Sequence, residues 1–171
     1  MAPAARAFVL VSALLLAACA HDTAPRVIAG PPAAGLPAGV DVAIERVVDG
    51  DTVVVTGKQT VRLIGVDAPE TKDPRRPVGC FGQEASRFLT STLPAGTAVR
   101  LVGDVEQHDR YGRLLAYLYR RDSGLFVNAE LVRQGYASVL TIPPNVAHAD
   151  EFVELAREAR VDGRGLWEAC P

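Results

Sequence analysis

The sequence predicts an α+β domain, mainly β, in which a small five-stranded barrel carries about three helices. The first observation is the order of patterns along the chain: three strands, one helix, two strands and two helices. Hairpin-like early strands with a helix before the later pair favour a barrel over a parallel sheet. The second is composition, since 171 residues with 49% apolar side chains supply a core and exclude wholesale disorder. No repeat and no further composition break follows Gly39, so one domain is expected.

Strands are predicted where apolar and polar residues alternate or where β-branched residues gather. Helices are predicted where apolar residues recur at helical spacing, and a glycine follows the end of two of them. The expected strands are Val40–Val48, Thr52–Thr56, Thr60–Val66, Thr97–Val102 and Leu114–Tyr119, and the expected helices are Gln83–Leu93, Phe126–Gln134 and Ala149–Asp162.

Residues 1–18 have the features of a secretory signal peptide. Arg6 is the only charge ahead of the run Ala7–Ala18, which is too short to cross a bilayer of about 30 Å. The run ends in Leu16-Ala17-Ala18-Cys19, which resembles a bacterial lipobox and implies cleavage before Cys19 and lipidation of its thiol. We therefore expect an exported protein with a membrane partner, its lipid anchor holding it at the periplasmic face of the outer membrane in a host with two membranes. Ordinary secretion is the alternative.

A tether and a disulfide are expected after the anchor. Residues 19–39 are rich in Pro, Ala and Gly, a composition that stays extended rather than folding alone, and the folded domain is expected at 40–171. Two cysteines remain, Cys80 and Cys170, and an even pair in an oxidising compartment is typical of a disulfide. A metal site or a catalytic cysteine is the weaker alternative, because neither residue has a His or Cys at ligand spacing.

The charge balance limits the kinds of partner. The chain has 18 Lys and Arg residues against 20 Asp and Glu residues, for a formal net charge of −2. A protein that binds polyanions simply by being basic is therefore excluded, and any phosphate site must be a local arrangement of a few cations. With 6% aromatic residues, a broad base-stacking platform is not expected either.

Polar groups gather at the ends of the predicted strands. Asp51 and Asp67 are two carboxylates that suit a hard cation such as Ca²⁺, with carbonyls and water completing its shell. Glu70 follows closely and suits the positioning of a water. Arg62 and Arg113 suit the bidentate binding of an anion. Each residue alone has an ordinary structural explanation, but together they are the groups that phosphodiester hydrolysis needs.

Three segments resemble the signature segments of the thermonuclease, or staphylococcal nuclease, family. They are Val48–Val53 (VDGDTV), Arg62–Thr71 (RLIGVDAPET) and Asp109–Arg113 (DRYGR). Leu131–Gly135 and Gly165–Trp167 are similar to further stretches of that family, in the same order. The resemblance implies an OB-fold barrel, which agrees with the predicted order of elements, and a monomer is expected.

The resemblance also implies an activity: Ca²⁺-dependent cleavage of DNA and RNA with little sequence specificity, leaving 3′-phosphate products. It implies that Asp51, Asp67 and the Ala68 backbone carbonyl hold Ca²⁺. It implies that Arg62 and Arg113 bind the phosphate and act in catalysis together with Glu70, the catalytic glutamate. It also implies that Arg110 and Tyr111 contact a terminal phosphate. Arg110 stands where the family usually has lysine.

One geometric condition follows from this set. Arg62 and Asp67 are five residues apart, so in a regular strand they point to opposite faces, and they share a site only if the chain bends at Gly65. Two departures from the family concern affinity. The run Leu140–Pro143 lacks the tyrosines on which a base packs, and the net charge is acidic. The alternatives to a nuclease are a nucleic-acid-binding module without catalysis and a structural envelope lipoprotein with a decayed site.

Overall fold

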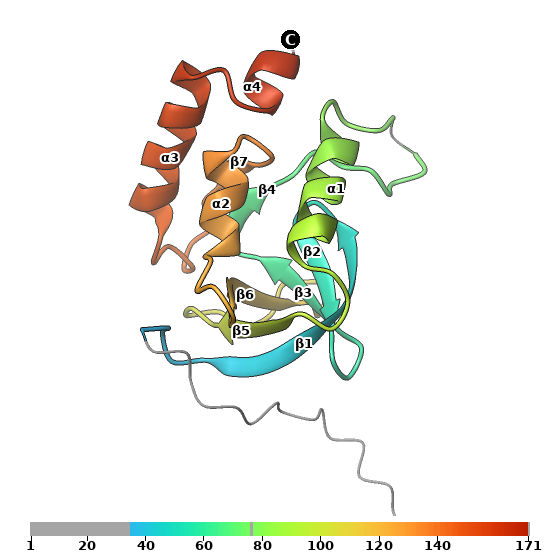
Figure 1. Cartoon of the computed structure of the whole chain (residues 1–171), viewed down its shortest axis with the longest axis vertical. Helices are drawn as coiled ribbons and strands as arrows, with labels where there is room; N and C mark the ends of the chain where they lie inside the picture. Colours follow the sequence, from blue (N-terminus) through green and yellow to red (C-terminus); the bar gives the residue numbers. More distant parts are fainter. Residues whose placement is uncertain (1–34, 76, 171) are drawn as a thin grey trace, which may run out of the picture.

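The computed structural model describes residues 35–75 and 77–170 (Figure 1). Five strands form a closed barrel in the order β1-β2-β3-β6-β5. This architecture confirms the predicted five-stranded barrel of mainly β character. The strands are β1 (Val40–Asp49), β2 (Thr52–Val55), β3 (Gln59–Leu63), β5 (Ala98–Val102) and β6 (Leu114–Arg120).

Barrel closure depends on the length and curvature of β1. Its first half pairs antiparallel with β5, and its second half pairs antiparallel with β2. The register of the β1–β2 pair shifts between Ile44 and Arg46 and again between Val47 and Asp49, which is how a strand bends sharply enough to serve two neighbours. The parallel pair β3–β6 completes the ring, with Val61 opposite Leu114. Buried residues such as Ile44, Val53 and Leu118 contribute to the core.

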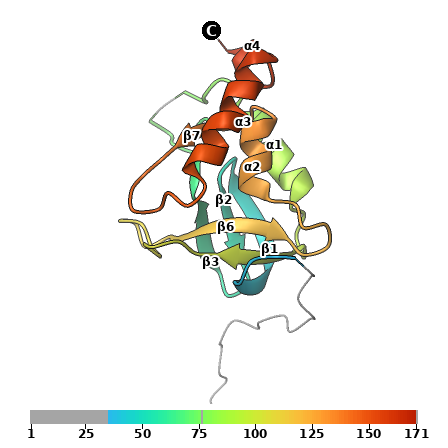
Figure 2. The same ribbon diagram turned by 90° about the vertical axis from the view of Figure 1, so that its left-hand side faces the viewer.

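Helices cover one end of the barrel. They are α1 (Gly82–Thr92), α2 (Val127–Arg133), α3 (Ala149–Val161) and α4 (Leu166–Ala169). Figures 1 and 2 place all four on the same side of the barrel strands. The apolar faces of the first three are buried, as the fully buried Leu89, Leu131 and Phe152 illustrate. Helix α4 is a single turn that the sequence pattern does not predict.

The expected third strand, Thr60–Val66, is two strands. β3 ends at Leu63, and a separate strand β4 (Gly65–Asp67) pairs with a short strand β7 (Ser138–Leu140), which the sequence pattern does not predict. The chain turns where β4 begins, at Gly65, whose φ is +80°. A Cβ at Gly65 would lie 2.3 Å from Cε2 of Phe152, so glycine is required both by the backbone angle and by the space. The predicted bend is confirmed.

The predicted disulfide is present. Cys80 and Cys170 are bonded across 90 residues of sequence, and the bond ties the loop before α1 to the end of the chain after α4. The expected signal peptide at 1–18, the lipidation site Cys19 and most of the expected tether, up to residue 34, lie outside the described residues. Within residues 35–75 and 77–170, no helix is long and apolar enough to cross a membrane.

Breaking this disulfide is expected to lower the free energy of unfolding by about 4 kcal/mol, because it closes a long loop in the unfolded chain. Urea unfolding with and without a reductant measures the loss. The double variant Cys80→Ser/Cys170→Ser should match the reduced protein and be insensitive to the reductant. An unchanged urea midpoint after reduction would contradict the expectation.

Candidate active site

Arg62, on β3, lies between two carboxylates. Its Nη1 donates to the carbonyl oxygens of Leu63 and Val66, at 2.8 and 2.7 Å. Its Nη2 lies 3.0 Å from Oδ2 of Asp51 and 3.0 Å from Oδ1 of Asp67. The two carbonyls belong to the segment that bends at Gly65, so the bend itself fixes the guanidinium. The predicted meeting of Arg62 and Asp67 is therefore observed.

Asp51 is held in place by the turn between β1 and β2. Its side chain is only 11% exposed, its Oδ1 accepts from the Thr52 hydroxyl at 2.8 Å, and its Oδ2 accepts from the Ala68 amide at 3.0 Å. A Cβ at Gly50 would lie 2.5 Å from the Cβ of Ala68, so the Asp-Gly-Asp turn permits this close approach. Asp67, in contrast, has a side chain that is 54% exposed.

Glu70 begins the loop that leads to α1, and it is exposed. Its Oε1 accepts from the amides of Lys72 and Asp73, at 2.6 and 3.2 Å. No described residue donates a hydrogen bond to Oε2. The amides thus orient the carboxylate through one oxygen and leave the other available to a water or a ligand.

Asp49 is a site-organising residue that the sequence pattern does not single out. Its carboxylate accepts from the hydroxyl of Thr71 at 2.7 Å and from the Thr71 amide at 3.2 Å. Because Thr71 adjoins Glu70, this contact fixes the start of the Glu70 loop against the β1–β2 turn. A carboxylate in an Asp-Gly turn ordinarily caps the turn, so no signal in the sequence points to a partner 22 residues away.

Asp109 organises the loop that carries Arg113. Its Oδ1 accepts from the amides of Tyr111 and Arg113, and its Oδ2 accepts from Nε of Arg113 at 2.6 Å. Burial pushes the pKa of Asp109 upward, but the hydrogen bonds from Arg113 and Tyr111 outweigh it and hold the pKa below its ordinary value. Asp109 is therefore ionised at neutral pH and aligns the Arg113 guanidinium, which keeps its terminal nitrogens for another anion.

Arg110 and Tyr111 occupy the exposed tip of the same loop. Nη2 of Arg110 donates to the Tyr111 hydroxyl, and its guanidinium carbon lies 4.7 Å from the centre of the Tyr111 ring. The guanidinium of Arg113 lies 5.4 Å from the same ring. Tyr111 is 67% exposed, so this basic and aromatic tip is accessible to a ligand.

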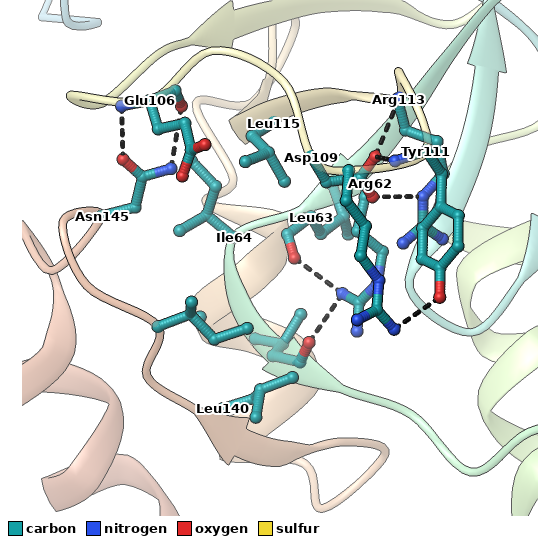
Figure 3. A pocket seen from close by; sticks show the side chains of 14 residues that line it. Arg62, Leu63, Ile64, Glu106, Asp109, Tyr111, Arg113, Leu115, Leu140 and Asn145 are labelled. Atoms are coloured by element: carbon teal, nitrogen blue, oxygen red, sulfur yellow. Dashed lines mark hydrogen bonds and ion pairs between the residues drawn. The ribbon is translucent and has the colours of Figure 1, made fainter.

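All eight predicted site residues line two adjoining hollows. The first has a volume of about 700 Å³ and is lined by carboxylates and arginines together. Its lining includes Asp51, Arg62, Asp67, Ala68, Glu70, Tyr111 and Arg113. The second, of about 500 Å³, shares Arg62, Tyr111 and Arg113 with the first and adds Arg110 (Figure 3). Its remaining wall is mainly aliphatic, and it includes Leu140 and Ile142 from the run that lacks an aromatic ring.

The donor set fits a hard cation. Asp51 and Asp67 each place one oxygen 3.0 Å from the same nitrogen of Arg62, so the two carboxylates already converge on one positive charge. In the part of the chain that the structure describes, no group of three or more His, Cys, Asp and Glu side chains converges. A cation here would therefore rest on two carboxylates, with backbone carbonyl and water oxygens completing the shell that Ca²⁺ prefers.

The fold and the cleft define a class: an OB-type barrel with a surface cleft lined by arginines and carboxylates. Sequence similarity places the chain in a particular family within this class. Residues 60–169 match the family described as "Staphylococcal nuclease homologue", and the chain belongs to this family.

Individual relatives agree with the assignment. The chain is 37% identical over 133 residues to a protein named Thermonuclease from Staphylococcus intermedius, covering 76% of this chain and 77% of that protein. It is 38% identical over 125 residues to Thermonuclease from Staphylococcus hyicus, covering 71% and 72%. It is also 36% identical over 132 residues to Endonuclease YncB from Bacillus subtilis, covering 75% and 62%. The resemblance of the three sequence segments to this family is thereby confirmed.

Proposed function

We propose that this protein is a Ca²⁺-dependent nuclease that hydrolyses phosphodiester bonds of DNA and RNA with low sequence specificity and leaves 3′-phosphate ends. One observation carries the proposal: a single cleft gathers Arg62, Arg113, Glu70 and the Asp51–Asp67 pair. Membership of a nuclease family and the names of the relatives, thermonuclease and endonuclease, support hydrolysis over binding alone. Carboxylates on a surface that only bound a polyanion would repel it, so the acidic half of the cleft favours an enzyme as well.

In this proposal each residue acts on a stated part of the substrate. Asp51, Asp67 and the Ala68 carbonyl would hold Ca²⁺, which would polarise a phosphoryl oxygen and offset its charge. Arg62 and Arg113 donate to the other oxygens of the scissile phosphate, where negative charge grows in the transition state. Arg110 and Tyr111 donate to a neighbouring phosphate from the exposed loop tip.

Glu70 positions the water that attacks phosphorus. Its Oε1 is held by two amides, and Oε2 accepts a hydrogen bond from the water. A new P–O bond forms and the bond from phosphorus to the 5′-oxygen breaks, so the products are a 3′-phosphate and a 5′-hydroxyl. The attacking water gives up one proton to solvent, and the departing 5′-oxygen gains one from solvent.

The site is proposed to work outside the cytoplasm. The signal-like residues 1–18 and the lipobox-like end at Cys19 support a lipid-anchored protein at the cell envelope, with secretion as the alternative. The disulfide between Cys80 and Cys170 supports this location, because such bonds persist in oxidising compartments.

The calcium requirement and the product ends test this proposal. Single-stranded DNA and RNA are incubated with the purified protein in Ca²⁺ or in EDTA, and the products are analysed by mass spectrometry. We expect degradation in Ca²⁺ only, with 3′-phosphate ends. Asp67→Asn, at a largely exposed carboxylate, should raise the Ca²⁺ concentration for half-maximal activity about tenfold or more, since calcium affinity depends on ligand charge. Equal activity in EDTA, or 5′-phosphate products, would contradict the proposal.

A further inference from the structure

One carboxylate in the second hollow has no role in the proposed hydrolysis. Glu106 lines this hollow and is exposed. None of the described residues donates a hydrogen bond to its carboxylate or forms an ion pair with it, although both of its backbone polar groups are bonded. A carboxylate of this kind is repelled by phosphate, so its place in a nucleotide-binding cleft needs another explanation.

The backbone of Glu106 is held firmly by Asn145. Asn145 is a buried residue, 5% exposed. Its Oδ1 accepts from the Glu106 amide at 2.7 Å, and its Nδ2 donates to the Glu106 carbonyl at 2.9 Å. The same loop is fixed once more by the Leu115 amide, which donates to the carbonyl of Gln107 at 2.8 Å. The side chain of Glu106 is thus presented from a preorganised backbone and remains open to a ligand.

Glu106 lies at the opposite end of the hollow from the phosphate-binding groups. Figure 3 shows Glu106 and Asn145 at one end and Tyr111 and Arg113 at the other, with aliphatic side chains between them, among them Leu63 and Leu115. A nucleotide has the matching order: a charged phosphate, then an apolar ring face, then a polar base edge. A nucleotide lying along this hollow with its phosphate at Arg113 would point its base edge toward Glu106.

We infer that Glu106 makes the nuclease discriminate among bases, favouring those that carry an amino group over thymine and uracil. This inference rests on the proposed function. Adenine, cytosine and guanine each present an exocyclic amino group that donates to a carboxylate. Thymine and uracil have no exocyclic amino group. Their one donor on this edge, the ring N3–H, is flanked on both sides by carbonyl oxygens, which repel the Glu106 carboxylate. Because Leu140 and Ile142 offer no aromatic ring for sequence-tolerant stacking, the polar contact carries more of the selectivity.

The test compares short single strands that contain one cleavable phosphodiester, the remaining linkages being methylphosphonates. The bases flanking that linkage are all adenine, all cytosine or all thymine, and kcat/KM is measured in Ca²⁺. We expect the adenine and cytosine strands to be cleaved about tenfold faster than the thymine strand, in line with the value of one well-placed base contact. Glu106→Gln, whose amide both donates and accepts, should reduce this ratio to near one.

Glu158→Gln is the matched control. It removes the same charge from an exposed position on α3 outside both hollows, so it should change the steering of DNA but keep the base ratio. A wild-type ratio near one, or a ratio unchanged in Glu106→Gln, would overturn the inference while leaving the nuclease intact. The absence of cleavage of unmodified single-stranded DNA and RNA in Ca²⁺ would overturn the proposed function and the inference with it.

Discussion

Arg113→Ala is expected to lower kcat on single-stranded DNA by a factor of about 10² to 10³, the usual effect of losing one preorganised donor to a developing negative charge. Arg113 is aligned by Asp109, and its side chain lies in both hollows. Its loss removes the guanidinium but leaves the loop intact, because Asp109 is still bonded to the backbone amides of Tyr111 and residue 113. Steady-state kinetics in saturating Ca²⁺ measure the effect.

Two further variants define the cause of this loss. Arg113→Lys keeps the charge but not the planar fork, so its kcat should fall between those of the wild type and Arg113→Ala. Arg157→Ala removes an exposed arginine on α3, paired with Glu154 and outside both hollows, and should retain the wild-type kcat. Arg113→Ala with wild-type kcat would show that this guanidinium does not act on the reacting phosphate.

Gly65→Ala is expected to destabilise the fold by about 2–5 kcal/mol, the combined cost of a left-handed backbone and an overpacked contact with Phe152. Activity should fall as well, because Arg62 is held by carbonyls on both sides of this bend. Urea unfolding measures the first effect, and kcat of the fraction that remains folded measures the second.

Gly96→Ala separates the two causes. Gly96 has a φ of +87°, close to that of Gly65, but a Cβ there would have no neighbour within 4 Å. Its substitution should cost only the backbone strain, about 1–2 kcal/mol, and should leave kcat unchanged. If the two alanine variants were equally stable, Phe152 would not restrict the bend, and the packing explanation for Gly65 would be wrong.

Much of the fold was predictable because its elements follow local patterns. The alternation in Val40–Val48 and the apolar stripe of α3 each report burial of one face, which is a property of the segment itself. The break at Gly65 was predictable for a different reason: Arg62 and Asp67 meet only if the strand ends there. Strand β7 and helix α4 were not predictable, since three or four residues are too few to show a period.

The candidate site shows the same division. Asp51, Asp67, Arg62 and Arg113 belong to short contiguous motifs, and the structure brings them into one cleft. Their supporting contacts are not encoded locally. The contacts of Asp49 with Thr71 and of Asn145 with residue 106 join positions 22 and 39 apart, and nothing in either segment specifies the other. The glutamate at 106 resembles an ordinary surface carboxylate until its backbone is seen to be fixed by a buried asparagine.

The most direct test of the central claim separates binding from cleavage in one variant. Glu70→Gln keeps the size of the side chain and every cation of the cleft, so single-stranded DNA should bind it in Ca²⁺ with a Kd close to that of the wild type. Its kcat should fall by a factor of about 10² or more, because the glutamine no longer accepts from the attacking water as a carboxylate does. Wild-type protein that binds DNA equally well in Ca²⁺ and EDTA, and cuts it in neither, would contradict the account and leave a binding module.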